Sequence, residues 1–272
     1  MMSKCYLYLH LILFKSGNME QKKVGIVILA TNAYFVLGVN FMRKFSHHYK
    51  GDAKITFYFF SDTDPKEYIT DDMDVQYIHQ THDTWMNATN SKFINMLSLE
   101  NCDSDYLIYV DADTSVSKDF TEEWFIGDTV GLEHFGNNGW MKDVKGYDRN
   151  PRSKAYVPYD TQLFQMYYHG CLFGGKKDKM MEVCKVLRDN QIEDKKIPYE
   201  PGVNDESYIN QYYHYNPPTL TVYLDKYMFN VSDKCGIEHN RDVNFSVEDL
   251  KKEMLANRNN LYDLQNGKLI VR

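Results

Sequence analysis

Short apolar runs recur along the first part of the chain and are separated by more polar segments. Four runs have the length of a strand: Val24–Ala30, Ile55–Phe60, Val75–His79 and Tyr106–Val110. A nearly continuous apolar run such as VGIVILA is typical of a strand that is buried on both faces of a parallel sheet. We therefore expect these runs to form the central strands of the protein.

Two segments between these strands have the pattern of helices. They are Tyr34–Tyr49 and Ser91–Glu100. Alternating strands and helices predict βαβ units, and hence an α/β protein with a mostly parallel central sheet flanked by helices. Ligands of such sheets bind at the carboxyl ends of the strands. This rule selects Thr31–Tyr34 and Asp111–Asp113 as candidate ligand-binding segments.

The second half of the chain has fewer long apolar runs. Gly127–Gln165 is rich in Gly, Asn, Asp and Pro, which predicts loops and short strands. We expect one helix over Lys176–Asn190, directly after two glycines. A further helix is expected to begin near Asp205 and to end before Pro217.

The two ends of the chain are expected to lie outside the main fold. The apolar stretch Cys5–Phe14 is short, whereas a membrane-spanning helix needs roughly 20 such residues, so we expect no transmembrane segment. The tail has the pattern of a polar helix and is expected to be accessory. These boundaries divide the chain into an N-terminal extension (1–22), one α/β domain (23–245) and an accessory tail (246–272).

Composition and charge narrow the classes of partner. The 272 residues carry a net charge of -7, which gives no long-range attraction for nucleic acid or for anionic lipid. A metal ion, a basic side chain or backbone N–H groups must therefore bind any phosphate of a ligand. The five cysteines are widely spaced and form no CxxC pair, which argues against a disulfide framework or a zinc knuckle. Reduced thiols in a cytoplasmic protein are the simplest account of them.

Asp111 and Asp113 follow the apolar run that ends at Val110. Two carboxylates at positions i and i+2 after a strand can turn toward one hard cation, Mg²⁺ or Mn²⁺, which prefers oxygen ligands. Such an ion would neutralise a diphosphate leaving group. Two other interpretations stay open: a polar turn at a strand end, and a haloacid-dehalogenase-type phosphatase with Asp111 as its nucleophile. The phosphatase motif opens its domain, whereas this motif follows three earlier strands, which makes that interpretation the weaker one.

Asp205 and Glu206 form a second acidic pair. Acids in the first turn of a helix are favoured by the helix dipole, which is the simplest interpretation of the pair. The loop before them contains Pro198, Pro201 and Gly202, so their side chains are also able to open into a cleft. A carboxylate in that position is suited to act as a nucleophile or to stabilise an oxocarbenium ion.

The segment His169–Gly175 (HGCLFGG) carries a histidine and ends in two consecutive glycines. Two glycines before a helix permit close approach of the backbone to a ligand, or simply a tight turn. His169 and His134 are each compatible with a structural role and with a role in a site.

Three longer motifs follow the aspartates in order: YDRNPRSKAYVP at 147–158, YYHGCLFGG at 167–175 and DESYIN at 205–210. The first resembles the pattern Tyr-Glu-Arg-Arg-Pro-x-Ser-x-Ala-Tyr-Ile-Pro of glycosyltransferase family 6. That family contains the blood-group A and B transferases, the α-1,3-galactosyltransferases and shorter microbial relatives. The similarity runs from about Val24 to Tyr227, and the order of four motifs makes it specific.

The resemblance implies a GT-A fold and an enzyme that transfers a sugar from a UDP-sugar, with retention of the α-configuration, to a β-galactoside or fucosylated glycan. It also implies a short, stemless protein of microbial or viral type. Asp111 and Asp113 match the ligands of the metal ion and the diphosphate. Tyr34 matches a residue beside the uracil or ribose, and Lys92 falls near a basic residue of the donor site.

Other matching positions surround the transferred sugar. Glu206 matches the catalytic carboxylate beside the anomeric carbon, and Asp205 matches its neighbour that binds the donor sugar. His134 matches a histidine that contacts the acceptor.

His169, Gly170 and Cys171 match three donor-site positions, of which the first and third tune the choice of donor. A histidine at the first position is similar to the galactose-transferring members, and the bulk of Cys171 crowds the pocket for a 2-acetamido group. We therefore expect UDP-galactose rather than UDP-N-acetylgalactosamine (UDP-GalNAc) as donor, with Mn²⁺ or Mg²⁺ as cofactor.

The chain departs from the family pattern at several points. Val203 and Asn204 stand where the family often has Trp-His, which removes an aromatic residue from the acceptor site, and Trp140 is a candidate replacement. The strand end YVDADT also resembles glycosyltransferase family 8, and a non-catalytic sugar-binding protein is a further alternative. The basic C-terminal segment of family 6 is echoed only by Lys234, His239 and Arg241.

Overall fold

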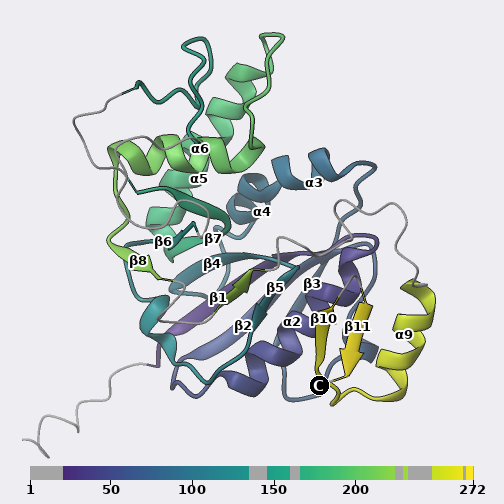
Figure 1. Ribbon diagram of the computed structural model, residues 1–272. Helices are drawn as coiled ribbons and strands as arrows, with labels where there is room; N and C mark the ends of the chain where they lie inside the picture. Colours follow the sequence, from purple (N-terminus) through teal and green to yellow (C-terminus); the bar gives the residue numbers. More distant parts are fainter. Residues whose placement is uncertain are drawn as a thin grey trace, which may run out of the picture.

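The computed structural model of the chain describes residues 21–134, 146–159, 166–223, 229–231, 247–265 and 268–271 (Figure 1). Nearly all of the expected N-terminal extension therefore lies outside the described residues. So do Trp140, Lys234, His239 and Arg241, and the expectations for these four side chains stay predictions.

A seven-stranded sheet runs through the middle of the molecule (Figure 1). The four strands at one edge are parallel to one another, whereas β7 is antiparallel to both of its neighbours and β8 is parallel to β6. From one edge to the other, the strands are β3 (Val75–His79), β2 (Lys54–Ser61), β1 (Lys23–Leu29), β4 (Tyr106–Asp111), β7 (Tyr168–Lys176), β6 (Thr129–Glu133) and β8 (Leu220–Val222).

Helices cover both faces of this sheet, because the central strands are apolar on both sides. Ile26 and Ile28 of β1 pack into the cluster that contains α2 (Tyr34–His48), while Val27 packs into the opposite cluster. That second cluster contains residues of α4 (Lys92–Ser98), α5 (Lys177–Asp194) and α6 (Asn204–Tyr215). The alternation of side chains along a strand thus produces a three-layer α/β arrangement.

The parallel strands and their helices confirm the predictions within one or two residues. The expected mostly parallel sheet flanked by helices is therefore present. One difference concerns Asp111, which is the last residue of β4 rather than the first residue after it. A short helix, α3 (Trp85–Asn90), was not predicted, because its six residues have no apolar periodicity and only Thr89 is buried. The hydroxyl of Thr84 caps it by accepting the Asn87 N–H at 3.2 Å.

The helix expected after the two glycines is present as α5, which begins at Lys177, but the glycines themselves lie at the end of β7. Neither alternative for them, a tight turn or an approach to a ligand, is what the structure has. Gly174 pairs with Ile108 of β4, and a Cβ atom at position 174 would lie 2.5 Å from the carbonyl oxygen of Leu107. Gly175 has a φ of +147° and approaches the backbone of Asp128. The glycines therefore permit close approach of protein backbone to protein backbone.

Four smaller strands and two short 3-10 helices complete the described structure. Beyond β4, β5 pairs with β9, and a β10–β11 hairpin follows helix α9 (Val247–Ala256) near the C-terminus. These elements are η1 (Lys66–Tyr68), β5 (Thr114–Val116), η2 (Glu122–Trp124), β9 (Phe229–Val231), β10 (Tyr262–Gln265) and β11 (Lys268–Val271).

The predicted polar helix of the tail is present as α9, and it is tied to α2. The buried guanidinium of Arg43 donates to the carbonyl oxygens of Tyr68, Met254, Asn257 and Asn260. Met254 itself is fully buried in the cluster that contains α2. The tail helix is thus part of the main hydrophobic core. Within the part of the chain that the structure describes, no helix combines the length and apolarity needed to cross a bilayer.

Candidate active site

One cavity of about 520 Å³ lies at the carboxyl ends of β1 and β4. Its wall is built from five segments: 31–34 after β1, 83–92 around α3, 111–113 at the end of β4, 169–171 of β7 and 202–206 at the start of α6. Of the ten site residues predicted from the sequence, nine line this cavity. The tenth, His134, packs against His169. The rule that ligands gather at strand ends therefore located the cavity.

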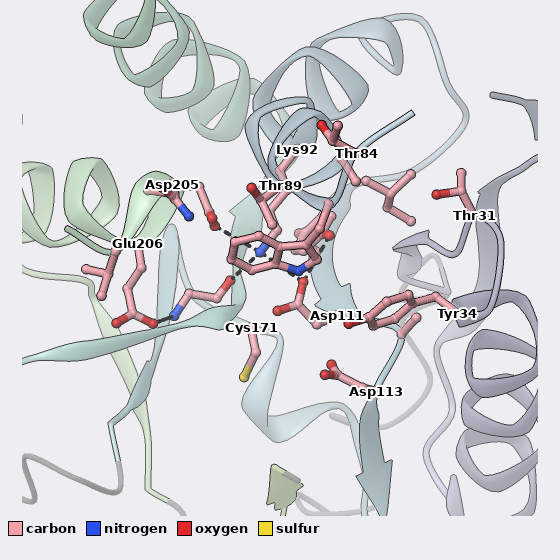
Figure 2. Close-up of a pocket in the computed structure, with 18 of the residues that line it drawn as sticks. Thr31, Tyr34, Thr84, Thr89, Lys92, Asp111, Asp113, Cys171, Asp205 and Glu206 are labelled. Atoms are coloured by element: carbon pink, nitrogen blue, oxygen red, sulfur yellow. Dashed lines mark hydrogen bonds and ion pairs between the residues drawn. The ribbon is translucent and has the colours of Figure 1, made fainter. Parts of the chain in front are cut away.

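The two aspartates of the strand end lie on the same side of the cavity (Figure 2). Ala112 between them is buried, with only 2% of its surface exposed, so the chain is anchored there. The Thr114 hydroxyl donates to the Asp111 carbonyl oxygen at 2.7 Å and fixes the turn. Asp111 and Asp113 thus project from a rigid corner.

Lys92 joins the end of β4 to the start of α6. Its Nζ atom lies 2.9 Å from Asp111 Oδ1 and 2.9 Å from Asp205 Oδ2, and its side chain is 5% exposed. Burial opposes the charge of this amine, but the two carboxylates outweigh it, so the pKa of Lys92 stays well above its usual value. The amine also donates to the carbonyl oxygen of Gly170 at 3.5 Å. Figure 2 shows these residues around the same point.

The carboxyl group of Asp205 is less acidic than usual. Burial raises its pKa to about 6, against the opposing effect of Lys92. Asp111, the other carboxylate that Lys92 contacts, also accepts a hydrogen bond from the Tyr109 hydroxyl, at 3.1 Å to its Oδ1 atom. Tyr109 was missed from the sequence because it looks like any aromatic residue of a buried strand.

Glu206 lies in the first turn of α6 and faces β7. Its Oε2 atom accepts the Gly170 N–H at 2.6 Å. Burial raises the pKa of Glu206 to about 7, and the hydrogen bonds from Gly170 and Tyr167 partly offset that effect. A Cβ atom at position 170 would lie 2.9 Å from Glu206 Cβ, so glycine is required for β7 and α6 to come this close. Both interpretations of the acidic pair are therefore confirmed: its members are first-turn acids and they line a cleft.

His134 and His169 form a stacked pair beside Glu206. Their ring centroids are 4.7 Å apart, with an interplanar angle of 14°. Burial lowers the pKa of His169 to about 4 and also lowers that of His134, so both rings are neutral at neutral pH. His169 Nδ1 accepts the Cys171 N–H at 3.1 Å, which places the ring proton on Nε2.

Histidine and glutamate are also possible metal ligands. One ligand atom each from His134, His169 and Glu206 lies within 4.8 Å of the others. Two ligands of a tetrahedral zinc ion are roughly 3.4 Å apart, given bonds of about 2.1 Å. His169 Nδ1 lies 3.6 Å from Glu206 Oε2 and His134 Nε2 lies 3.9 Å from Glu206 Oε1, but the two stacked rings do not direct their nitrogens to one point, and His169 Nδ1 already accepts the Cys171 N–H. We therefore interpret the group as neutral imidazoles packed near a carboxyl group.

The opposite end of the cavity is formed by residues that follow β1 and β3, and a residue after β2 supports them from outside the cavity wall. Asn32, with a φ of +55°, donates its N–H to Asp62 Oδ1 at 2.7 Å and its side-chain amide to the His82 carbonyl oxygen at 3.2 Å. Tyr34 begins α2 next to this turn. Asp62 and His82 were missed, although they also follow strands at the same edge of the sheet, and the strand-end rule would have found them.

The remaining predicted residues differ in exposure. Cys171 is buried, and burial raises the pKa of its thiol well above the usual value, so it acts as bulk in the cavity wall. Val203 is 41% exposed, whereas Asn204 is buried and has a φ of +45°. Trp85 is half-exposed at the cavity and was also missed, because α3 was not predicted.

Comparison with known proteins places this site in a family. The sequence profile of glycosyltransferase family 6 matches residues 8–257. The O-antigen biosynthesis glycosyltransferase WbnI of Escherichia coli is 25% identical over 200 residues, which cover 72% of this chain and 82% of that protein. Histo-blood group ABO system transferase 2 of Rattus norvegicus is 25% identical over 216 residues, which cover 76% of this chain and 63% of the rat protein.

A third relative is globoside alpha-1,3-N-acetylgalactosaminyltransferase 1 of Gallus gallus, which is 24% identical over 207 residues. These residues cover 72% of this chain and 59% of the chicken protein, so the chain spans about three fifths of the length of these two animal relatives. The profile match covers most of the chain, and the seven-stranded sheet with helices on both faces is the GT-A fold of that family. The chain belongs to glycosyltransferase family 6.

Proposed function

We propose that this glycosyltransferase moves galactose from UDP-galactose, with UDP-GalNAc as the less favoured donor, in α-linkage to a β-galactoside-type glycan. One observation carries the proposal: Glu206 lies in the same cavity as Asp111 and Asp113. A buried carboxyl group is thus available for the anomeric carbon, and an acidic corner is available for the diphosphate.

The charge of the cavity supports a role for a divalent cation. Lys92 is the single basic side chain among the described lining residues, and it is already paired with two carboxylates. A diphosphate would therefore meet a surface that is negative overall, because the described lining carries the acidic side chains of Asp83, Asp111, Asp113, Asp205 and Glu206.

The residues present fit Mn²⁺ or Mg²⁺. Asp111 and Asp113 offer only oxygen ligands, which these ions prefer, and they stand on a rigid corner of the cavity wall. They would hold the ion. A bound ion would neutralise the negative charge on the departing diphosphate.

Glu206 would act on the sugar itself. In one route its carboxylate attacks the anomeric carbon while the bond from that carbon to the diphosphate oxygen breaks. The acceptor hydroxyl then displaces Glu206 from the same carbon, and its proton passes to the diphosphate of UDP. In the other route the acceptor attacks from the face that UDP leaves, and Glu206 stabilises the oxocarbenium charge. Both routes give retention, and both use Glu206 in its ionised form.

Donor choice rests on the side chains that β7 presents. Cys171 is fully packed in the cavity wall, and its sulfur takes up space that a 2-acetamido group would need. The chicken relative is named as an N-acetylgalactosaminyltransferase of globoside, the rat relative as a transferase of the histo-blood group ABO system, and the bacterial relative as a glycosyltransferase of O-antigen biosynthesis. These names support a glycan acceptor.

An assay of UDP release tests the proposal. Purified protein would be incubated with UDP-galactose, UDP-GalNAc and UDP-glucose, each with Mn²⁺ or with EDTA, and with lactose or a fucosylated β-galactoside as acceptor. We expect release to be fastest from UDP-galactose with Mn²⁺ and to rise on addition of acceptor. Asp113→Asn should lower the rate by about two orders of magnitude or more, because the ion loses a charged ligand. Full activity in EDTA would contradict the metal claim, and absence of release from every donor would contradict the function.

A further inference from the structure

The carboxyl group of Glu206 accepts a hydrogen bond from the Gly170 N–H at 2.6 Å. The hydroxyl of Tyr167, the residue that directly precedes β7, lies close enough to Glu206 to be a second donor. Tyr167 is 1% exposed, and nothing in its sequence context distinguishes it from a core tyrosine.

The Tyr167 hydroxyl has a second acceptor within reach. It lies 3.2 Å from the carbonyl oxygen of Gly146. A Cβ atom at position 146 would lie 2.6 Å from Tyr167 Cζ, so the glycine allows this backbone to approach the ring. A phenol carries one proton, and it can donate that proton either to Gly146 or to Glu206.

The ring of Tyr167 is held in place, whichever of the two acceptors its hydroxyl donates to. Tyr147 contacts it edge-on with a centroid distance of 5.4 Å, and His134 does so at 5.3 Å. Burial raises the pKa of Tyr167 far above its usual value, so the phenol stays protonated and meets a carboxylate as a donor.

We propose that Tyr167 is a positioning residue for Glu206: its hydroxyl turns from the Gly146 carbonyl to the Glu206 carboxylate and holds that group ionised and fixed beside the donor sugar. This inference rests on the proposed function of Glu206. Tyr167 acts through Glu206 and needs no contact with the sugar.

The surroundings of Glu206 explain why a second donor matters. Burial raises its pKa to about 7, and Asp205 on the same helix raises it further, whereas Lys92 on α4 lowers it. The neutral rings of His134 and His169 add no positive charge. Because burial holds the pKa of Glu206 near neutrality, the loss of one hydrogen bond to its carboxylate should have a large effect on the ionised fraction.

The first test measures the ionisation of Glu206 without any substrate. Full-length protein labelled with ¹³C at the glutamate carboxyl would be titrated by NMR between about pH 5 and pH 9, and Glu206→Gln would assign the signal. We expect Tyr167→Phe to raise the midpoint by about one pH unit, the size expected for loss of a hydrogen bond to a charged group.

The matched control is Tyr147→Phe. Tyr147 is a buried neighbour of Tyr167, and its hydroxyl donates to the Met166 carbonyl oxygen at 3.0 Å. This variant loses a buried hydroxyl in the same cluster but should leave the Glu206 midpoint unchanged. An unchanged midpoint in Tyr167→Phe, or an equal shift in both variants, would overturn the inference.

The second test follows UDP release from UDP-galactose against pH. In Tyr167→Phe, kcat at pH 7 should fall about fivefold and recover above about pH 9, because the ionised fraction drops from about one half to about one tenth. KM should stay within about twofold of the wild type. A loss that is the same at every pH would contradict a positioning role.

Replacement of Tyr167 by 4-aminophenylalanine provides a rescue, because the aniline can donate from nearly the same place. This variant should return kcat at the lower pH values toward that of the wild type. If the wild type releases no UDP, the proposed function fails; if the titration does not shift, the inference about Tyr167 fails by itself.

Discussion

At the scale of single residues, charge is the feature that organises the site. Lys92 is the cation between Asp111 and Asp205, and a buried pair of this kind is sensitive to the loss of one partner. Burial leaves Asp205 and Glu206 with raised pKa values of about 6 and about 7. The cavity therefore holds these two carboxyl groups close to the pH at which they lose their protons.

Lys92→Met should destabilise the protein because it leaves two carboxyl groups buried without their cation. We expect the free energy of unfolding at pH 8 to fall by about 3–5 kcal/mol. A carboxyl group with a raised pKa in the folded state binds protons that the unfolded state does not, so stability is lost as pH rises through that window and regained as it falls. Urea unfolding should thus show a smaller deficit at pH 5 than at pH 8.

Lys23→Met is the matched control for this experiment. Lys23 makes an exposed ion pair with Asp103 at 2.9 Å, which should contribute less than about 1 kcal/mol. A deficit of similar size in both variants, or one that does not depend on pH, would contradict the role of the buried pair.

Glu206→Gln tests the residue that the proposed function assigns to the anomeric carbon. The amide oxygen can still accept the Gly170 N–H, so the fold should persist, but the nucleophilic charge is lost. Turnover should fall by about three orders of magnitude while the affinity for UDP, measured by calorimetry, stays within about twofold. Unchanged turnover would remove Glu206 from the mechanism.

At the scale of elements, β7 is the least expected part of the site. It carries His169, Gly170 and Cys171 at one end and the paired glycines at the other, and it lies between β4 and β6. Its close contact with β4 sets the distance from Asp111 and Asp113 to His169, Gly170 and Cys171. The sequence pattern did not predict β7 as a strand, because two consecutive glycines usually mark a turn and are rare inside a strand.

Gly174→Ala should therefore lower stability. Its methyl group would lie 2.5 Å from the Leu107 carbonyl oxygen and 2.7 Å from Ile108 Cα, which are backbone atoms of β4 and move only with the strand. We expect a loss of about 1–3 kcal/mol in the free energy of unfolding, measured in urea. Gly202→Ala is the control: a Cβ atom there meets nothing within 4 Å and should change stability by less than about 0.5 kcal/mol.

At the scale of the whole molecule, the parallel half of the sheet was predictable because strands buried on both faces show as continuous apolar runs. The acidic residues of the site were predictable because they follow strands or open a helix. What was not predictable depends on contacts between distant segments: Lys92 bridges Asp111 and Asp205, and Tyr167 reaches Glu206. Such contacts follow from the packing of α4, α6 and β7, and the sequence around each residue gives no sign of them.

The C-terminal segment offers a test at this scale, because a buried side chain of α2, Arg43, donates to the backbone of α9 and of the residues after it. Arg43→Met removes the donors to four carbonyl oxygens, including that of Met254. We expect a loss of at least about 2 kcal/mol and faster hydrogen exchange over 247–262. Arg188→Met, which removes an exposed pair, should leave that exchange unchanged. Equal exchange in both variants would show that α9 does not depend on Arg43.

The position of β7 has a consequence for how the specificity of this enzyme can change. β7 is paired with β4 at residues 172–176 and with β6 at residues 168–169 and 173–175, so the strand cannot slide along its neighbours to admit a larger sugar. The space beside position 171 then depends mainly on the volume of the side chain there. Under the proposed function, a new donor preference is then reachable in single substitutions at Cys171, without a compensating change elsewhere. Lineages of such enzymes would be free to exchange donors quickly while their folds stay the same.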